Sequence, residues 1–145
     1  MNMSNKSTNP KGTKDYGPSE LLSIRFIINK IRNVFISFGY SEIETPSIEK
    51  RATLYEKYGD EGDRLIFKIL NSGDYLSKAT FSDQIESKSL TKQISEKALR
   101  YDLTVPFARF VAQNRNDIIF PFKRYHMQTV WRADKPQKGR DREFF

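Results

Sequence analysis

The sequence predicts an α+β fold in which an antiparallel β-sheet is flanked by helices. Three observations predict it: a long amphipathic stretch after Pro18, several short strand-like segments between turn residues, and a basic hairpin at residues 122–145. The chain of 145 residues has the length of a single domain. It has no internal repeat and no linker, so we expect a single folded unit over residues 11–145.

The composition excludes several classes of protein. No apolar run approaches the roughly 18 residues that a membrane span needs, and the polar start lacks the apolar core of a signal peptide. The absence of cysteine excludes disulfides, zinc–thiolate sites and thiol nucleophiles. We therefore expect a cytoplasmic protein that does not contact a membrane.

The clearest helical signal begins near Pro18, a residue that suits the first turn of a helix. Apolar side chains then recur on one helical face, at positions 24, 27, 28, 31, 34, 35 and 38. Gly39 suits the position just after a helix end, and Tyr40 is expected to fold back onto the last turn. Upstream, we expect disorder over residues 1–10 and structured coil over 11–18.

The middle of the chain predicts shorter elements. Pro46 ends a strand because the residue before a proline is held extended. Residues 71–96 are rich in Ser, Lys and Thr, and predict an exposed hairpin or a mobile excursion. The other expected elements are a strand over Ser41–Thr45, a brief helix over Leu54–Tyr58, strands over Arg64–Leu70 and Lys97–Tyr101, and a helix over Val105–Gln113 with Thr104 as its N-cap.

The C-terminal hairpin carries the strongest functional signal. Alternation along the strand Phe122–Ala133 places its polar side chains, Arg132 among them, on one face and Tyr125 and Trp131 on the other. On the return strand Arg140, Arg142 and Phe144 share a face. Residues 121–142 hold seven basic side chains against two acidic ones, within a chain of net charge +7. Guanidinium groups bind phosphate oxygens in pairs, so the hairpin predicts a site for a polyphosphate or nucleic acid.

Four segments, in order, resemble the histidyl-tRNA synthetase family of class II aminoacyl-tRNA synthetases. They are Lys11–Asp15 with Pro18, Phe38–Pro46 (motif 1), Leu99–Arg109, and Tyr125–Phe145 (motif 2). The resemblance implies the N-terminal part of a class II catalytic domain, cut off after motif 2. It also implies that the enzyme activates L-histidine with ATP, passes it to the 3′ end of histidine tRNA, and forms a homodimer through the motif 1 region.

The resemblance also implies roles for individual residues. Arg132 is the catalytic residue, which bridges the amino-acid carboxylate and the α-phosphate. Asp102, Leu103 and Thr104 bind the amino acid, with Asp102 and Thr104 accepting from its ammonium group. Two further groups are implied: Asp134, Arg140 and Phe144 for ATP, with Phe144 stacked on adenine, and Lys135, Lys138 and Arg142 for tRNA.

The sequence departs from the family pattern at two positions and at its end. Asp134 stands where a longer Glu is common, and Asp141 replaces a frequent aromatic residue. The residues that complete the histidine pocket normally follow Phe145, so we expect a fragment that is inactive alone. The Mg²⁺ expected with ATP would have its ligands outside this chain, and no metal site is predicted within it.

Other interpretations stay open. A regulatory paralogue that senses histidine without charging tRNA would share most of these segments, as would a plain nucleic-acid-binding module that uses the basic hairpin. Single residues have structural alternatives too: Asp102 as a turn or capping residue, Phe144 as sheet core, and the arginines as a solvated face. His126, the single histidine, is assigned no role.

Overall fold

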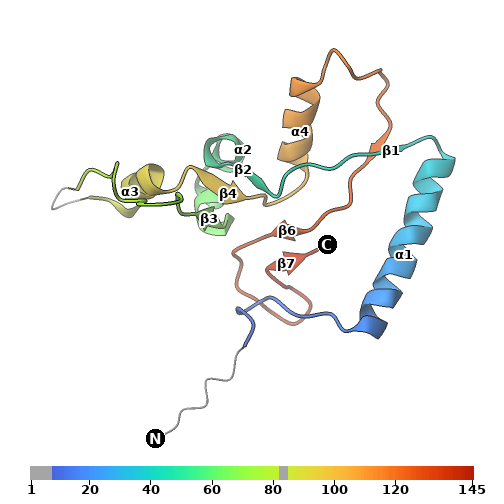
Figure 1. Cartoon of the computed structure of the whole chain (residues 1–145), viewed down its shortest axis with the longest axis horizontal. Coiled ribbons are helices and arrows are strands. Elements are labelled where there is room, and N and C mark those ends of the chain that lie inside the picture. The colour runs from blue at the N-terminus through green and yellow to red at the C-terminus, as the bar shows by residue number, and fades with distance from the viewer. Residues whose placement is uncertain (1–7, 82–84) are drawn as a thin grey trace, which may run out of the picture.

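The computed structural model describes residues 8–81 and 85–145, and it has the expected α+β architecture (Figure 1). The first seven residues of the segment predicted to be disordered lie outside the described residues. The elements in chain order are α1 (Pro18–Ser37), β1 (Ser41–Glu42), β2 (Ile48–Lys50), α2 (Arg51–Leu65), β3 (Lys68–Ile69), α3 (Ser87–Ile94), β4 (Lys97–Leu99), α4 (Thr104–Gln113), β5 (Arg124–Tyr125), β6 (Val130–Trp131) and β7 (Glu143–Phe144).

Helix α1 begins and ends where the sequence predicts. Pro18 opens its first turn, and Gly39 adopts a φ of 74°, which glycine tolerates best. The Gly39 amide donates to the Ile36 carbonyl at 2.9 Å and the Tyr40 amide to the Phe35 carbonyl at 3.0 Å. These two bonds form a Schellman motif, and the Tyr40 ring lies 5.5 Å from the Phe35 ring.

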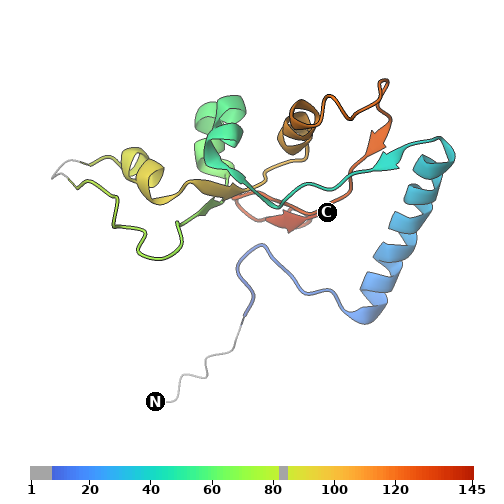
Figure 2. The same cartoon turned by 45° about the horizontal axis from the view of Figure 1, so that its top comes forward.

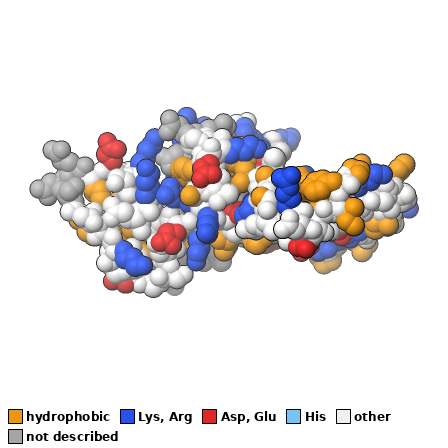
Figure 3. All heavy atoms as spheres, turned by 90° about the horizontal axis from the view of Figure 1, so that it is seen from above, with side chains coloured by type: hydrophobic (Ala, Val, Ile, Leu, Met, Phe, Trp, Pro, Cys, Tyr) orange, Lys and Arg blue, Asp and Glu red, His pale blue; other side chains and the backbone are white. Residues whose placement is uncertain are grey.

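The apolar face of α1 is only partly covered. Ile24, Ile28 and Phe35 are half-buried, and the Phe35 ring stacks on Tyr125 at 5.2 Å. Other members of the predicted face, such as Ile27 and Val34, remain more than half exposed. The helix stands at one end of the molecule in Figure 1, and hydrophobic side chains gather at that end in Figure 3.

The core lies between one small sheet and two helices. Strands β2, β4 and β3 form an antiparallel sheet in that order, and α2 and α4 lie on the same side of it (Figure 2). Leu54 of α2, Ala98 of β4 and Val105 of α4 are buried together with Ile66. The core is therefore built from segments that precede and follow the 71–96 excursion.

Two predicted elements were wrong in extent. The brief helix over Leu54–Tyr58 is the first part of α2, which starts at Arg51 and resumes beyond a kink to end at Leu65, and the strand predicted from Arg64 is reduced to Lys68–Ile69. The kink lies at Gly59, whose φ of 50° and ψ of −132° are not helical. Leu54 before the kink and Ile66 just after α2 are both buried.

The excursion over residues 71–96 is not a simple hairpin. Residues 82–84 lie outside the described residues, but α3 occupies Ser87–Ile94. The Asn71 amide donates to the Ile94 carbonyl at 2.8 Å, which ties the start of the excursion to the end of α3. The helix was missed because it buries no side chain completely and carries no long apolar stripe.

The strand predicted over Phe122–Ala133 is interrupted. Its ends form β5, which pairs in parallel with β1, and β6, which pairs antiparallel with β7. Residues 126–129 between them are irregular. The face predicted to be polar is partly buried, since His126 and Val130 are only 9% and 7% exposed. The hairpin itself is confirmed, with Val130 opposite Phe144 and Trp131 opposite Glu143.

Candidate functional site

Arg132 is held at the end of the β6–β7 ribbon by its own backbone. Its amide donates to the Arg142 carbonyl at 2.8 Å, and the amides on either side, Trp131 and Ala133, donate to Arg100 and Leu65. The side chain follows: Nε donates to the Tyr101 carbonyl at 3.2 Å. Its guanidinium lies 4.4 Å from the Tyr101 ring centroid and 5.2 Å from that of Phe144. Three contacts thus orient the predicted catalytic cation.

Asp102 caps helix α4. Its Oδ1 accepts from the amides of Thr104 at 3.0 Å and Val105 at 3.3 Å. Thr104, expected as the N-cap, is instead the first residue of α4. The capping alternative for Asp102 is therefore confirmed, and it leaves the second carboxylate oxygen for other partners.

Tyr58 connects the two predicted groups. Its hydroxyl donates to Asp102 Oδ2 at 2.5 Å, and its ring lies 5.1 Å from that of Tyr101. Burial, followed by the bond to Asp102, raises the pKa of the Tyr58 hydroxyl, whereas the nearby charge of Arg132 lowers it. Arg132 and Asp102 therefore lie around the same pair of tyrosine rings.

The basic loop at 133–142 divides into tethered and exposed cations. Arg140 forms an exposed ion pair with Asp134 at 3.1 Å. Arg142 is half-buried, and its Nε donates to the Asp134 carbonyl at 2.8 Å. Lys135 and Lys138 are exposed. These contacts give Arg142 a structural role in holding the loop, while the two lysines are open to a large partner.

The N-terminal segment packs against this loop. The Arg142 amide donates to the Gly12 carbonyl at 2.7 Å. Gly12 has a φ of 87°, and a Cβ there would meet Arg142 Cγ at 2.8 Å and Pro136 Cγ at 2.9 Å. Only glycine fits this contact without displacement, which joins the first and last of the four resembling segments.

Arg100 has a role that no local sequence pattern predicts. This arginine is only 2% exposed. Its Nε donates to the Thr129 carbonyl at 2.8 Å, and Nη1 donates to the Thr45 carbonyl at 2.7 Å and to Gln128 Oε1 at 3.1 Å. Arg100 therefore joins motif 1, β4 and the approach to β6. A charged residue two positions before Asp102 was the available signal, but nothing local predicts its burial.

An ion pair with a buried carboxylate links α4 to β2. Arg109 makes two bonds to the Glu49 carboxylate, Nε to Oε2 at 2.8 Å and Nη2 to Oε1 at 2.7 Å. The Glu49 side chain is 4% exposed. This paired geometry fixes α4 against β2, and with it the helix end that Asp102 caps.

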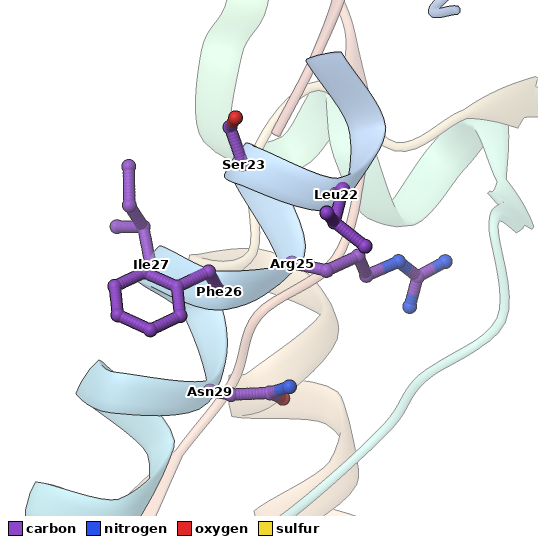
Figure 4. Close-up of a pocket in the computed structure, with 6 residues that line it drawn as sticks. All are labelled: Leu22, Ser23, Arg25, Phe26, Ile27 and Asn29. Atoms are coloured by element: carbon purple, nitrogen blue, oxygen red, sulfur yellow. The ribbon is translucent and has the colours of Figure 1, made fainter. Parts of the chain in front are cut away.

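Two hollows lie on the surface beside α1. One, of about 590 Å³, lies between α1 and the β6–β7 ribbon, and its lining includes Arg25, Gln128, Trp131 and Phe144, the residue expected to stack on adenine. The other is lined by one helix alone, with Leu22, Phe26 and Ile27 projecting from α1 (Figure 4). Neither is lined by Arg132, Asp102 or Thr104.

Two features of the described residues concern metal ions and membranes. Within residues 8–81 and 85–145, no three His, Asp or Glu side chains converge as a metal site requires. None of the helices that the structure describes has the length and apolar character to cross a membrane.

Comparison with known proteins shows the family to which the chain belongs. A family model described as histidyl-tRNA synthetase matches residues 12–145. A histidine–tRNA ligase from Christiangramia forsetii is 61% identical over 145 residues, which are 99% of this chain and 32% of the relative. The chain thus spans about a third of the length of the curated relatives it matches.

Solved structures agree with the sequence comparison. A histidyl-tRNA synthetase from Nostoc sp. PCC 7120 superposes with a TM-score of 0.68 at 31% identity, covering 97% of this chain and 27% of that one. A Bacillus halodurans protein described as an ATP phosphoribosyltransferase regulatory subunit/histidyl-tRNA synthetase gives 0.67 at 26% identity, covering 96% and 30%. The α+β fold of this chain is therefore that of the class II histidine enzymes.

Proposed function

This chain belongs to the histidyl-tRNA synthetase family, and on that premise we propose that its full-length gene product charges histidine tRNA. In the first step a carboxylate oxygen of L-histidine attacks the α-phosphorus of ATP, and pyrophosphate leaves. In the second, a ribose hydroxyl at the tRNA 3′ end attacks the histidyl carbonyl, and AMP leaves. Both steps depend on alignment and charge neutralisation.

The observation that carries this proposal is the convergence of Arg132 and Asp102 around Tyr101. Arg132 donates to the Tyr101 carbonyl, and Asp102 is the next residue along the chain. A cation and an anion placed next to the same residue suit a ligand that carries both charges, as the carboxylate and ammonium of a free amino acid do. Asp102 accepts three protein donors. A carboxylate has about four acceptor positions, so one remains for the ammonium group.

The remaining site residues have proposed roles consistent with their exposure. Arg140 forms a surface ion pair with Asp134 and can exchange that partner for ATP phosphates at little cost in free energy. Phe144, half-buried beside Arg132, offers a ring for adenine. Leu103 and Thr104 lie at the start of α4, beside the carboxylate that caps it. Lys135 and Lys138 would meet the tRNA backbone.

The test is histidine-dependent ATP–pyrophosphate exchange by the full-length gene product. Arg132→Ala should lower kcat by about 10²–10³-fold, the usual effect of removing one preorganised donor at a transition-state oxyanion. Arg115→Ala, at an exposed position in the loop after α4, is the matched control and should exchange normally. Near-normal exchange by Arg132→Ala would refute the role.

A homodimer through the motif 1 region is part of this proposal. In helix α1, Leu22 is 74% and Phe26 is 63% exposed, and Phe38, just after the helix, is 67% exposed. Exposed apolar surface of this kind marks an interface. Sedimentation of the full-length gene product should give a dimer, and Phe26→Glu should shift it toward the monomer.

A second candidate is a histidine-sensing regulatory protein, which the likeness to the Bacillus halodurans protein favours. The name of that protein includes both a regulatory subunit and a synthetase. The exposed Lys135 and Lys138 and the exchangeable Arg140 support the synthetase, because a sensor needs no grip on ATP or tRNA. Titration with ATP distinguishes them, since the sensor would show no binding.

A further inference from the structure

Tyr58 occupies a position in the site that none of the four resembling segments includes. It comes from α2, 44 residues before Asp102, and its hydroxyl contacts the carboxylate oxygen that the helix cap leaves open. Resting on the function proposed above, we infer that Tyr58 is a positioning residue for amino-acid binding. Its hydroxyl holds the Asp102 carboxylate in the cap-bound orientation and keeps it apart from the Arg132 guanidinium.

The need for such a residue follows from the charges. Arg132 contacts the carbonyl and the ring of Tyr101, and Asp102 follows Tyr101 in the chain. Both charged groups must stay available if one is to bind a carboxylate and the other an ammonium. Within the described residues no ion pair joins them, and Arg132 Nε is directed to the Tyr101 carbonyl instead. An ion pair between them would neutralise both binding groups at once.

The hydroxyl is a reliable donor because of its surroundings. Burial first, and then the bond to Asp102, raises its pKa above the ordinary value, so it stays protonated at neutral and moderately alkaline pH. The ring is fixed as well as the hydroxyl, because it packs against Tyr101 at 5.1 Å. Tyr58 thus reaches Asp102 from a ring that already has a defined place.

The backbone of α2 holds Tyr58 in that place. Leu54, one turn earlier, is completely buried, and Gly59 immediately after Tyr58 breaks the helical path. One turn later Gly62 touches it closely: a Cβ there would lie 2.8 Å from Tyr58 Cβ and 3.1 Å from Ile66 Cδ1. The position of Tyr58 therefore depends on a glycine that leaves it room.

The experiment measures pyrophosphate exchange by the full-length gene product with Tyr58→Phe, which removes only the hydroxyl. We expect the KM for histidine to rise about tenfold, the equivalent of one hydrogen bond to a charged group. The KM for ATP and the Tm should change little, a split that a purely structural role would not give. Tyr125→Phe is the matched control, since it removes a hydroxyl bonded to the remote Glu42 carboxylate at 3.0 Å.

Two further variants make the result decisive. With Asp102→Asn no ion pair to Arg132 can form, so adding Tyr58→Phe should change the KM for histidine little further. Gly62→Ala keeps the hydroxyl but displaces its ring, and should also raise that KM. An unchanged KM in Tyr58→Phe, or an equal rise with and without Asp102→Asn, would overturn the positioning role alone. A wild-type protein without histidine-dependent exchange would refute the proposed function, and the positioning role with it.

Discussion

The guanidinium of Arg100 donates a hydrogen bond to the backbone carbonyl of Thr45, 2.7 Å away and 55 residues earlier in the chain. The same side chain also reaches the Thr129 carbonyl. Arg100 is thus a buried brace between the end of motif 1 and the start of the motif 2 ribbon. Because Tyr101 and Asp102 follow it directly, the brace also sets the place of the candidate site.

Replacing Arg100 should destabilise the protein strongly. Arg100→Met keeps much of the side-chain volume but leaves the buried Thr45 carbonyl and the partly buried Thr129 carbonyl without this donor. Each orphaned buried acceptor costs about 1–3 kcal/mol, so we expect a loss of roughly 3 kcal/mol or more in urea denaturation. Arg115→Met, at an exposed position, should stay close to wild type. A loss as small in Arg100→Met as in this control would disprove the brace.

Gly12→Ala should loosen the contact between the N-terminal segment and the motif 2 loop. Both Gly12 and Gly39 have positive φ, but a Cβ at Gly39 would meet no atom within 4 Å, whereas one at Gly12 would meet Arg142 and Pro136. Gly39→Ala therefore pays only the backbone cost of about 1 kcal/mol. Gly12→Ala should lose clearly more stability than this control, and equal losses would show that the close contact does not form.

Removing one partner of the Glu49–Arg109 ion pair should destabilise the protein. Arg109→Met leaves the Glu49 carboxylate, 4% exposed, without its two guanidinium donors. Leaving one buried charge unpaired typically costs about 3–5 kcal/mol. The double substitution Glu49→Gln with Arg109→Met should recover part of that loss in urea denaturation. Additive losses would mean that the pair is not coupled.

The buried environment of His126 predicts that the stability of the protein depends on pH. Its Nε2 lies 2.5 Å from Gln128 Oε1, which indicates the tautomer with the proton on Nε2. Nδ1 is buried and, among the described residues, has no hydrogen-bond partner. Burial lowers the pKa of the ring, and the charges of Arg100 and Arg124 act in the same direction.

A histidine pKa below its unfolded value means that the unfolded chain takes up the proton more readily. The stabilising contribution is therefore complete above the unfolded pKa of about 6.5 and is lost as the pH falls. Urea denaturation at pH 7.5 and 5.5 should show a larger loss in wild type than in His126→Gln. Since His126 is the single histidine of the sequence, the difference isolates its titration. Equal losses would contradict the lowered pKa.

The sequence predicted what depends on local signals. Gly39 and the periodic apolar residues before it set the limits of α1, and turn residues with basic side chains marked the motif 2 hairpin. What it missed depends on contacts between distant segments. Helix α2 resumes after the kink at Gly59, and Leu54 and Ile66 on either side of that kink are buried in one cluster with Ala98 of β4. No local pattern could place Tyr58 against Asp102 or bury Arg100 beneath Thr129.

The most direct measurement is a crystal structure of the full-length gene product with L-histidine and a non-hydrolysable ATP analogue. It should place the histidine ammonium within hydrogen-bond distance of Asp102, and the carboxylate and α-phosphate within reach of Arg132. A histidine or an α-phosphate bound away from Asp102 and Arg132, or an Arg132 side chain turned away from them, would contradict the account.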